Sequence, residues 1–254
     1  MPDAPESAQH AKPFVYESRS FKALHFSISE IQSRMQLEDP HALALEYTRT
    51  MMGFLLFNPR PDNIAMIGLG GGSLAKFCYR YLPKSLIQVV EINPHVIALR
   101  DAFHVPPDNE RFRVIQGDGA HFVRHPPSRF DVLLVDGFNS QGQPARLASQ
   151  RFYDDCHGSL QPGGVLVANL HCGHQHYEVF LDRIRRSFSG SVLVVDDGEL
   201  SNSIVFACKG DALEKQRVGV MRPPKSMETS GAEQLLAAFA LISSALKDRR
   251  RSPP

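Results

Sequence analysis

The sequence predicts a doubly wound α/β fold built on a mostly parallel β-sheet. From residue 63 to residue 209, short runs rich in valine, isoleucine and leucine alternate with segments of helical periodicity. The apolar runs lack polar alternation, which is typical of strands that are buried on both faces. Strands that alternate with helices are joined by crossover connections, and these connections favour a parallel sheet with helices on both faces.

The residues before this region form a smaller unit. Residues 1–13 are polar, and we expect them to form a disordered tail. Short apolar runs separated by turn residues follow from residue 14, and they predict a small antiparallel β element. Asp39 and Pro40 are typical of an N-cap and a first helical residue, so a helix is expected to begin there. Residues 14–57 are therefore the β element and a linking helix.

Residues 58–210 are predicted to form the main domain. Ser149 is the expected N-cap of one of its helices. The predicted strands cover residues 64–68, 86–91, 112–116, 130–136, 165–170, 191–196 and 203–208, and the predicted helices cover residues 73–82, 94–103, 149–160 and 177–188. The expected result is a Rossmann-like, seven-stranded, mostly parallel sheet of the class I methyltransferase type.

The residues after this domain continue as a polar segment and one helix. Residues 211–246 are expected to pack on the domain, with an amphipathic helix over residues 233–246. Residues 247–254 are rich in basic side chains, and we expect them to form a solvated tail.

The overall composition excludes several classes of protein. The chain has 254 residues, with 28 Lys and Arg against 27 Asp and Glu, so its net charge of +1 gives no general attraction to nucleic acid or to a membrane surface. No apolar run approaches the roughly 20 residues that a membrane-spanning helix needs, and no secretory signal is visible. The 4 cysteines lack CxxC spacing, so we expect reduced thiols in a cytoplasmic protein.

A glycine-rich turn follows the first strand of the main domain. Gly68, Gly70, Gly71 and Gly72 lie between that strand and a helix. Glycines at such a turn let the backbone bend tightly and let a ligand approach without a side chain in the way. In open α/β sheets the ligand binds beyond the carboxyl ends of the strands, so this turn is a candidate binding site.

Carboxylates follow the next two strands. Glu91 ends the second strand, about 20 residues after the glycines, where an acidic residue can accept hydrogen bonds from ribose hydroxyls. Asp118 lies in a Gly-Asp-Gly sequence after the third strand, where it can accept a hydrogen bond from an exocyclic amine such as that of adenine. Alone, each acid is most often an ordinary loop residue, but together with the glycines they predict a nucleoside pocket.

Two classes of nucleoside compete for this pocket. A dinucleotide favours G-x-G-x-x-G, and Ser73 occupies the third glycine position here. An oxidoreductase also needs a substantial catalytic region, and little chain follows the last strand. An S-adenosyl compound fits better, because it has no pyrophosphate.

A cluster of histidines and a cysteine follows the fifth strand, at residues 171–176. Metal sites usually take ligands from two separated elements, and the sequence offers no second cluster. We therefore expect a polar loop at the rim of the pocket and no metal site.

Five motifs together resemble one enzyme family. IGLGGGSL, VEINPHVI, QGDGAHFV, FDVLLVDGFN and PGGVLVANL, in this order, resemble the polyamine aminopropyltransferases, the spermidine synthase family, in a bacterial branch. The resemblance covers residues 14–209. It implies transfer of an aminopropyl group from decarboxylated S-adenosylmethionine, as a co-substrate, to an amine such as putrescine, with release of methylthioadenosine. It also implies a homodimer and no permanently bound cofactor.

The resemblance implies roles for particular residues. Asp136, after the fourth strand, is the carboxylate that faces the attacking amine. Tyr47 and Asn139 lie at positions that contact the amine substrate. The implied nucleoside-binding residues are Gln32, Gly68, Gly70, Gly72, Glu91, Asp118 and Gly119.

Two departures from the family pattern concern the amine. The family usually has an acidic residue inside the glycine turn, where this chain has Gly71, and a second carboxylate after the fourth strand, where it has Asn139. Both departures remove negative charge from the region that would bind a diamine. Two alternatives therefore stay open: an S-adenosylmethionine-dependent methyltransferase on the same sheet, and a nucleoside-binding protein with little catalysis.

Overall fold

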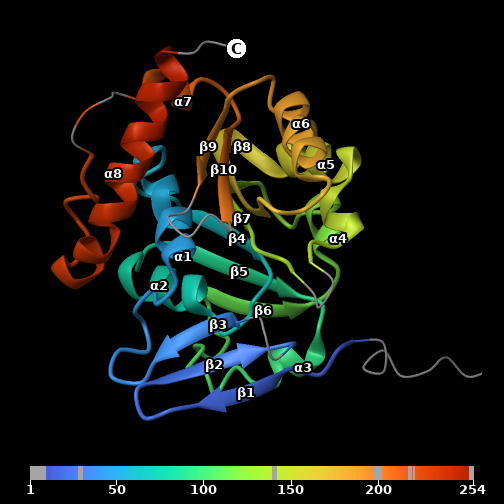
Figure 1. Cartoon of the computed structure of the whole chain (residues 1–254), viewed down its shortest axis with the longest axis vertical. Helices are drawn as coiled ribbons and strands as arrows, with labels where there is room; N and C mark the ends of the chain where they lie inside the picture. The colour runs from blue at the N-terminus through green and yellow to red at the C-terminus, as the bar shows by residue number, and fades with distance from the viewer. Residues whose placement is uncertain are drawn as a thin grey trace, which may run out of the picture.

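The computed structural model describes residues 10–27, 31–138, 142–196, 202–216, 219 and 221–251. The described residues form two β-sheets, with strand orders β1-β2-β3 and β6-β5-β4-β7-β8-β10-β9 (Figure 1). The small sheet lies below the large one in Figure 1, and helices flank the large sheet on both sides. The predicted fold class is therefore confirmed.

The small sheet is the N-terminal β element that the sequence predicts. Its strands are β1 (Phe14–Glu17), β2 (Phe21–His25) and β3 (Ile31–Gln36), and both pairings are antiparallel. Leu24 and Met35 from this sheet are buried in the same apolar cluster as residues of the large domain, whereas every residue of β1 is exposed. The sheet is thus packed on the domain by one face.

The large sheet contains the seven strands of the main domain. They are β4 (Asn63–Ile67), β5 (Leu86–Glu91), β6 (Phe112–Gln116), β7 (Phe130–Val135), β8 (Leu160–His171), β9 (Val192–Asp196) and β10 (Asn202–Cys208). Strands β4 to β8 run parallel, and β10 is antiparallel to both β8 and β9. From β4 the chain continues first to β5 and β6 on one side, and then to β7 and β8 on the other. The space between β4 and β7 is therefore the switch point where such sheets bind ligands.

Helices bury alternate residues of these strands on the two faces of the sheet. The helices are α1 (Glu46–Met51), η2 (Met52–Leu56), α2 (Ser73–Tyr81), α3 (Pro94–Ile97), α4 (Gly119–Arg124), η3 (Ala145–Ala148), α5 (Gln150–Ser159), α6 (Tyr177–Ser187), α7 (Ala212–Lys215) and α8 (Thr229–Arg251). One apolar cluster joins β4 to α1, α2 and α8, and the other joins it to α5 and α6. Two filled layers hold the sheet rigid beneath its ligand-binding edge.

The helix expected to begin at Asp39 begins later, at Glu46, so that prediction is wrong. The Asp39 carboxylate accepts a hydrogen bond from the His41 N–H at 3.1 Å, which makes a local turn. The Leu43 N–H donates to the Gln234 side chain from α8 at 2.9 Å. The backbone N–H groups of His41 and Leu43 therefore donate to side chains, and the Leu43 bond is a tertiary contact with α8.

Three other helices also differ from the prediction. The helix expected over residues 94–103 is helical only to Ile97 and continues as turns. Helix α4 begins directly after Asp118, and no helix was predicted at this position. Helix α8 extends beyond residues 233–246 to Arg251, and the Arg249 side chain donates to the Val192 carbonyl at 3.0 Å, which fixes residues that were expected to be a tail.

Among the described residues, no helix has both the length and the apolar composition needed to cross a bilayer.

Candidate functional site

The glycine turn joins β4 to α2 at the switch point of the sheet. Gly68 has a φ of +97°, and a Cβ at this position would collide with the Asp136 carbonyl oxygen. The Asp136 N–H also donates to the Ile67 carbonyl at 2.9 Å. The absence of a side chain at Gly68 thus lets the turn and the end of β7 touch through their backbones.

The space beside Gly71 is already filled by other side chains. A Cβ at Gly71 would lie 2.7 Å from the Ser33 hydroxyl and 2.8 Å from Phe103 Cδ1. Ser33 belongs to β3, so the small sheet covers the turn from one side. An acidic side chain at this position would require its neighbours to move, and the departure from the family pattern therefore has a steric counterpart.

Glu91 lies directly beneath the glycine turn, at the end of β5. Its two carboxylate oxygens accept hydrogen bonds from the backbone N–H groups of Leu69 at 2.9 Å and of Asn93 at 2.8 Å. Burial raises the pKa of Glu91, and these hydrogen bonds oppose that rise. The backbone N–H of Ile92 also donates to the carboxylate, and three donors still leave part of its acceptor capacity for a sugar hydroxyl.

Asp118 caps α4 and also forms an ion pair. Its Oδ1 accepts the N–H groups of Ala120 at 2.7 Å and His121 at 3.3 Å, and its Oδ2 accepts Arg146 Nη1 at 2.7 Å. Burial acts to raise the pKa of Asp118, but the bond from Arg146 and the two backbone bonds outweigh it and lower the pKa. Asp118 therefore remains a carboxylate at neutral pH. Gly119, the next residue, is buried, and a Cβ there would collide with Ile67.

Asp136 follows β7 and has one hydrogen-bond donor at each carboxylate oxygen. Tyr47 Oη donates to Oδ2 at 3.1 Å, and Asn169 Nδ2 donates to Oδ1 at 2.9 Å. Burial raises the pKa of Asp136, and the bonds from Asn169 and Tyr47 act against it. Burial and the Asp136 charge hold the pKa of Tyr47 well above its usual value, so Tyr47 stays a protonated donor.

Asn169 and Arg146 also contact these carboxylates, and neither was predicted from the sequence. Asn169 is the one polar residue in the apolar run of residues 165–170 within β8, and that break in the pattern was a usable signal. Its Oδ1 is buried and has no partner among the described residues, which leaves an acceptor beside Asp136. Arg146 gives no signal in the sequence, because it is an exposed arginine in a short 3₁₀ helix.

Of the remaining predicted site residues, some lie at or near the glycine turn and one lies outside the described residues. Gln32 is half-buried on β3, next to Ser33, which lies against the glycine turn. Gly70 and Gly72 have φ values of +52° and +69°, as the tight turn requires. Asn139 lies outside the described residues. Tyr47, Asp136 and the glycine turn are thus brought together at the carboxyl ends of the central strands β4 and β7.

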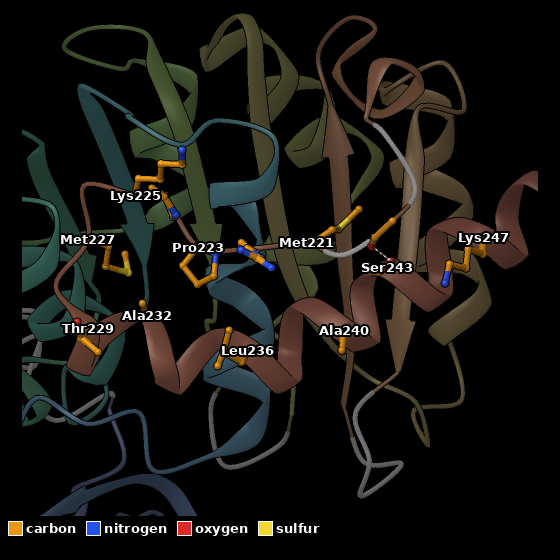
Figure 2. Close-up of a pocket in the computed structure, with 13 residues that line it drawn as sticks. Met221, Pro223, Lys225, Met227, Thr229, Ala232, Leu236, Ala240, Ser243 and Lys247 are labelled. Carbon is orange, nitrogen blue, oxygen red and sulfur yellow. Dashed lines mark hydrogen bonds between the residues drawn. The ribbon is translucent and has the colours of Figure 1, made fainter.

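A large cavity lies elsewhere in the molecule. It has a volume of about 720 Å³ and lies between α8 and residues 221–227 (Figure 2). Arg222, Lys225 and Lys247 contribute to its wall, and its described lining residues include no carboxylate and none of the predicted site residues. A cationic ligand such as a sulfonium or a diamine is poorly matched to such a wall. Among the described residues, no group of three or more His, Cys, Asp or Glu side chains is arranged to hold a metal ion.

Comparison with known proteins identifies the family. The model of the spermine/spermidine synthase domain matches residues 44–193. The chain belongs to the spermine/spermidine synthase family. It is 39% identical to a polyamine aminopropyltransferase of Chromobacterium violaceum over 194 residues, which cover 76% of this chain and 74% of the relative.

Solved structures of the family share the fold. A probable spermidine synthase from Corynebacterium glutamicum superposes with a TM-score of 0.69 at 22% identity, covering 78% of this chain and 77% of that one. A spermidine synthase in complex with the transition state analogue AdoDATO superposes with a TM-score of 0.61 at 20% identity, covering 92% and 87% of the two chains. The spermine/spermidine synthase fold thus extends over most of this chain.

Proposed function

We propose that this protein is a polyamine aminopropyltransferase that uses decarboxylated S-adenosylmethionine as its co-substrate. The observation that carries the proposal is the Tyr47–Asp136–Asn169 cluster, which lies in backbone contact with the glycine turn at the switch point of the sheet. The names of the relatives support the same activity. No resident cofactor is required.

The proposed reaction is a direct displacement at carbon. The nitrogen lone pair of a primary amine attacks the aminopropyl carbon beside the sulfonium, the C–S bond breaks, and methylthioadenosine leaves as a neutral thioether. The new C–N bond leaves a proton on nitrogen, and Asp136 accepts it before passing it to water. Because a sulfonium is a good leaving group, the protein mainly orients the reactants and keeps the amine unprotonated.

The nucleoside half of the site uses the strand ends of β4, β5 and β6. In this proposal Glu91 accepts hydrogen bonds from the ribose hydroxyls, and Asp118 accepts a hydrogen bond from the exocyclic amine of adenine. The turn of Gly68, Gly70 and Gly72 carries the sulfonium end, Gly119 lies beside the base, and Gln32 adds a polar contact from β3. The raised pKa of Asp136 favours proton acceptance from an ammonium near neutral pH.

The test identifies the product. The protein is incubated with decarboxylated or intact S-adenosylmethionine and a panel of amines that includes putrescine. Release of methylthioadenosine is the expected result, and release of S-adenosylhomocysteine in its place would overturn the proposal in favour of methyl transfer. Asp136→Asn should lower turnover by about 100-fold and leave methylthioadenosine affinity unchanged. Asp182→Asn is the control, because Asp182 pairs only with nearby Arg185 on the exposed surface of α6 in the described contacts.

We also propose a cytoplasmic homodimer. The outer aromatic face of the small sheet, defined here as Phe14, Tyr16 and Ile31, is exposed by 44%, 54% and 47%. The register of β1, β2 and β3 places these side chains on one face with His25, whose ring stacks on Phe14 at 5.1 Å. Exposed aromatic patches of this kind mark protein interfaces, and β1 adds an edge strand with unpaired backbone groups.

A further inference from the structure

The acceptor atoms of Asp118 are not equally available to a ligand. Its Oδ1 already accepts the two N–H groups that begin α4, from Ala120 and His121. Two donors use the two lone pairs of that oxygen. Oδ2 is the oxygen left to meet an adenine amine, and Arg146 Nη1 already donates to it at 2.7 Å, so an amine that binds there must either share this oxygen with the guanidinium or displace it.

Arg146 differs from the arginines that hold the fold together. Its side chain is 81% exposed, whereas that of Asp118 is 23% exposed. The neighbouring Arg183 instead donates at 2.7 Å to the Ala148 carbonyl and connects two elements. Because Arg146 is already surrounded by water, it can exchange the carboxylate for water at little cost.

We propose that Arg146 is a displaceable latch on the adenine subsite, a specificity-determining residue that covers Asp118 Oδ2 until an adenine amine takes its place. This inference rests on the proposed assignment of Asp118 to adenine. A base must then compete with a charged donor, and the exocyclic amine of adenine can replace the hydrogen bond that Arg146 gives up. A nucleoside that carries an oxygen at that position cannot, because two acceptors face each other.

The latch also gives the site an unusual dependence on salt. Methylthioadenosine is uncharged, so salt does not screen any attraction between it and the protein. Salt does weaken the Arg146–Asp118 ion pair with which the nucleoside competes. Raising the salt concentration should therefore strengthen binding of this neutral ligand.

The experiment measures methylthioadenosine affinity by calorimetry in wild type, Arg146→Ala, Asp118→Asn and the double variant. Asparagine preserves the cap of α4, so Asp118→Asn should fold. We expect Arg146→Ala to bind about two- to fivefold more tightly, as removal of a surface ion pair allows. Asp118→Asn should bind at least about tenfold more weakly, and the double variant should gain nothing from loss of the arginine. The matched control is Arg124→Ala, which breaks the Arg124–Asp155 pair of 3.0 Å between α4 and α5 and should leave affinity unchanged.

Two further arms test the mechanism. 5′-Methylthioinosine, which has oxygen in place of the amine, should gain nothing from Arg146→Ala. Between about 0.05 and about 0.5 M salt, wild type should bind methylthioadenosine more tightly while Arg146→Ala stays constant. An equal gain for both nucleosides, or no salt effect, would overturn the latch.

The outcomes separate this inference from the function on which it rests. If Asp118→Asn weakens binding but Arg146→Ala does not strengthen it, the latch is wrong and the adenine assignment stands. If Asp118→Asn binds methylthioadenosine as well as wild type does, both the adenine assignment and the proposed role of Arg146 are wrong. Neither result changes which product the enzyme releases, which is the measurement that decides the proposed function.

Discussion

Asp136 takes its chemical character from side chains on two different elements. Tyr47 comes from α1 and Asn169 from β8, and each supplies one donor to the carboxylate. Their hydrogen bonds favour the ionised form, whereas burial disfavours it. The balance between these effects sets the pH at which the carboxylate can accept a proton.

Tyr47→Phe should move the acid limb of the pH–rate profile to higher pH. In the proposed reaction the ionised form of Asp136 accepts the proton, so activity is expected to fall as the pH drops through the pKa of Asp136. Loss of the Tyr47 donor destabilises the carboxylate and raises the pKa of Asp136 further. The measurement is kcat/KM for methylthioadenosine release between about pH 5 and pH 8.

The control for this prediction is Tyr79→Phe. The Tyr79 hydroxyl accepts a bond from Asn109 at 3.2 Å in an exposed contact away from Asp136. That variant should keep the wild-type profile. A Tyr47→Phe profile that coincides with wild type would show that the tyrosine does not tune the base.

At the scale of elements, the glycine turn and the end of β7 form one backbone unit. Gly68 leaves no room for a side chain against the Asp136 carbonyl, and the Asp136 N–H bonds back to the last residue of β4. The position of the Asp136 carboxylate therefore depends on the conformation of the glycine turn.

Gly68→Ala should lower the free energy of unfolding by more than the cost of a left-handed backbone alone. The matched control is Gly163→Ala, since Gly163 has a φ of +81° and nothing within 4 Å of its would-be Cβ. The control should lose about 1–2 kcal/mol from backbone strain, and Gly68→Ala should lose at least about 3 kcal/mol and most of its activity. Urea unfolding measures both. Equal losses would mean that the collision with Asp136 relaxes without consequence.

The sequence predicted elements well where their signals are local. Residues 86–91 form β5 as expected, because a mostly apolar run there is bounded by turn residues. The predicted start of α1 was wrong, because the Leu43 N–H donates a hydrogen bond to Gln234, which lies 191 residues away in the chain. Asn169 interrupts an apolar run and so left a signal in the sequence, but its contact with Asp136 and that of Arg146 with Asp118 appear only when the strand ends meet.

At the scale of the whole molecule, the small sheet has one face on the domain and one in solvent. Leu24 and Met35 are buried on the inner side, and the outer aromatic face is open. A stable dimer through this face would bury aromatic side chains that otherwise remain in water.

The double variant Phe14→Lys/Tyr16→Lys should convert the proposed dimer to a monomer. Charged side chains on the outer aromatic face would repel one another across a symmetric interface. Light scattering should give twice the 28.3 kDa chain mass for wild type and a single chain mass for the variant. Leu236→Lys is the control, because Leu236 is 51% exposed on α8. A dimer broken only by Leu236→Lys would place the interface on α8.

The order of strands in the large sheet has a consequence for synthesis of the chain. Strand β10 lies between β8 and β9 although it follows both in the sequence. While a ribosome makes β9, the neighbour on which that strand must pair has not yet been translated. The free edge of β8, whose central residues Leu166, Val167 and Ala168 are fully buried in the finished protein, stays open during this interval. Residues 209–251 then act as a tether, which lets β10 leave the ribosome and close that edge before translation is complete.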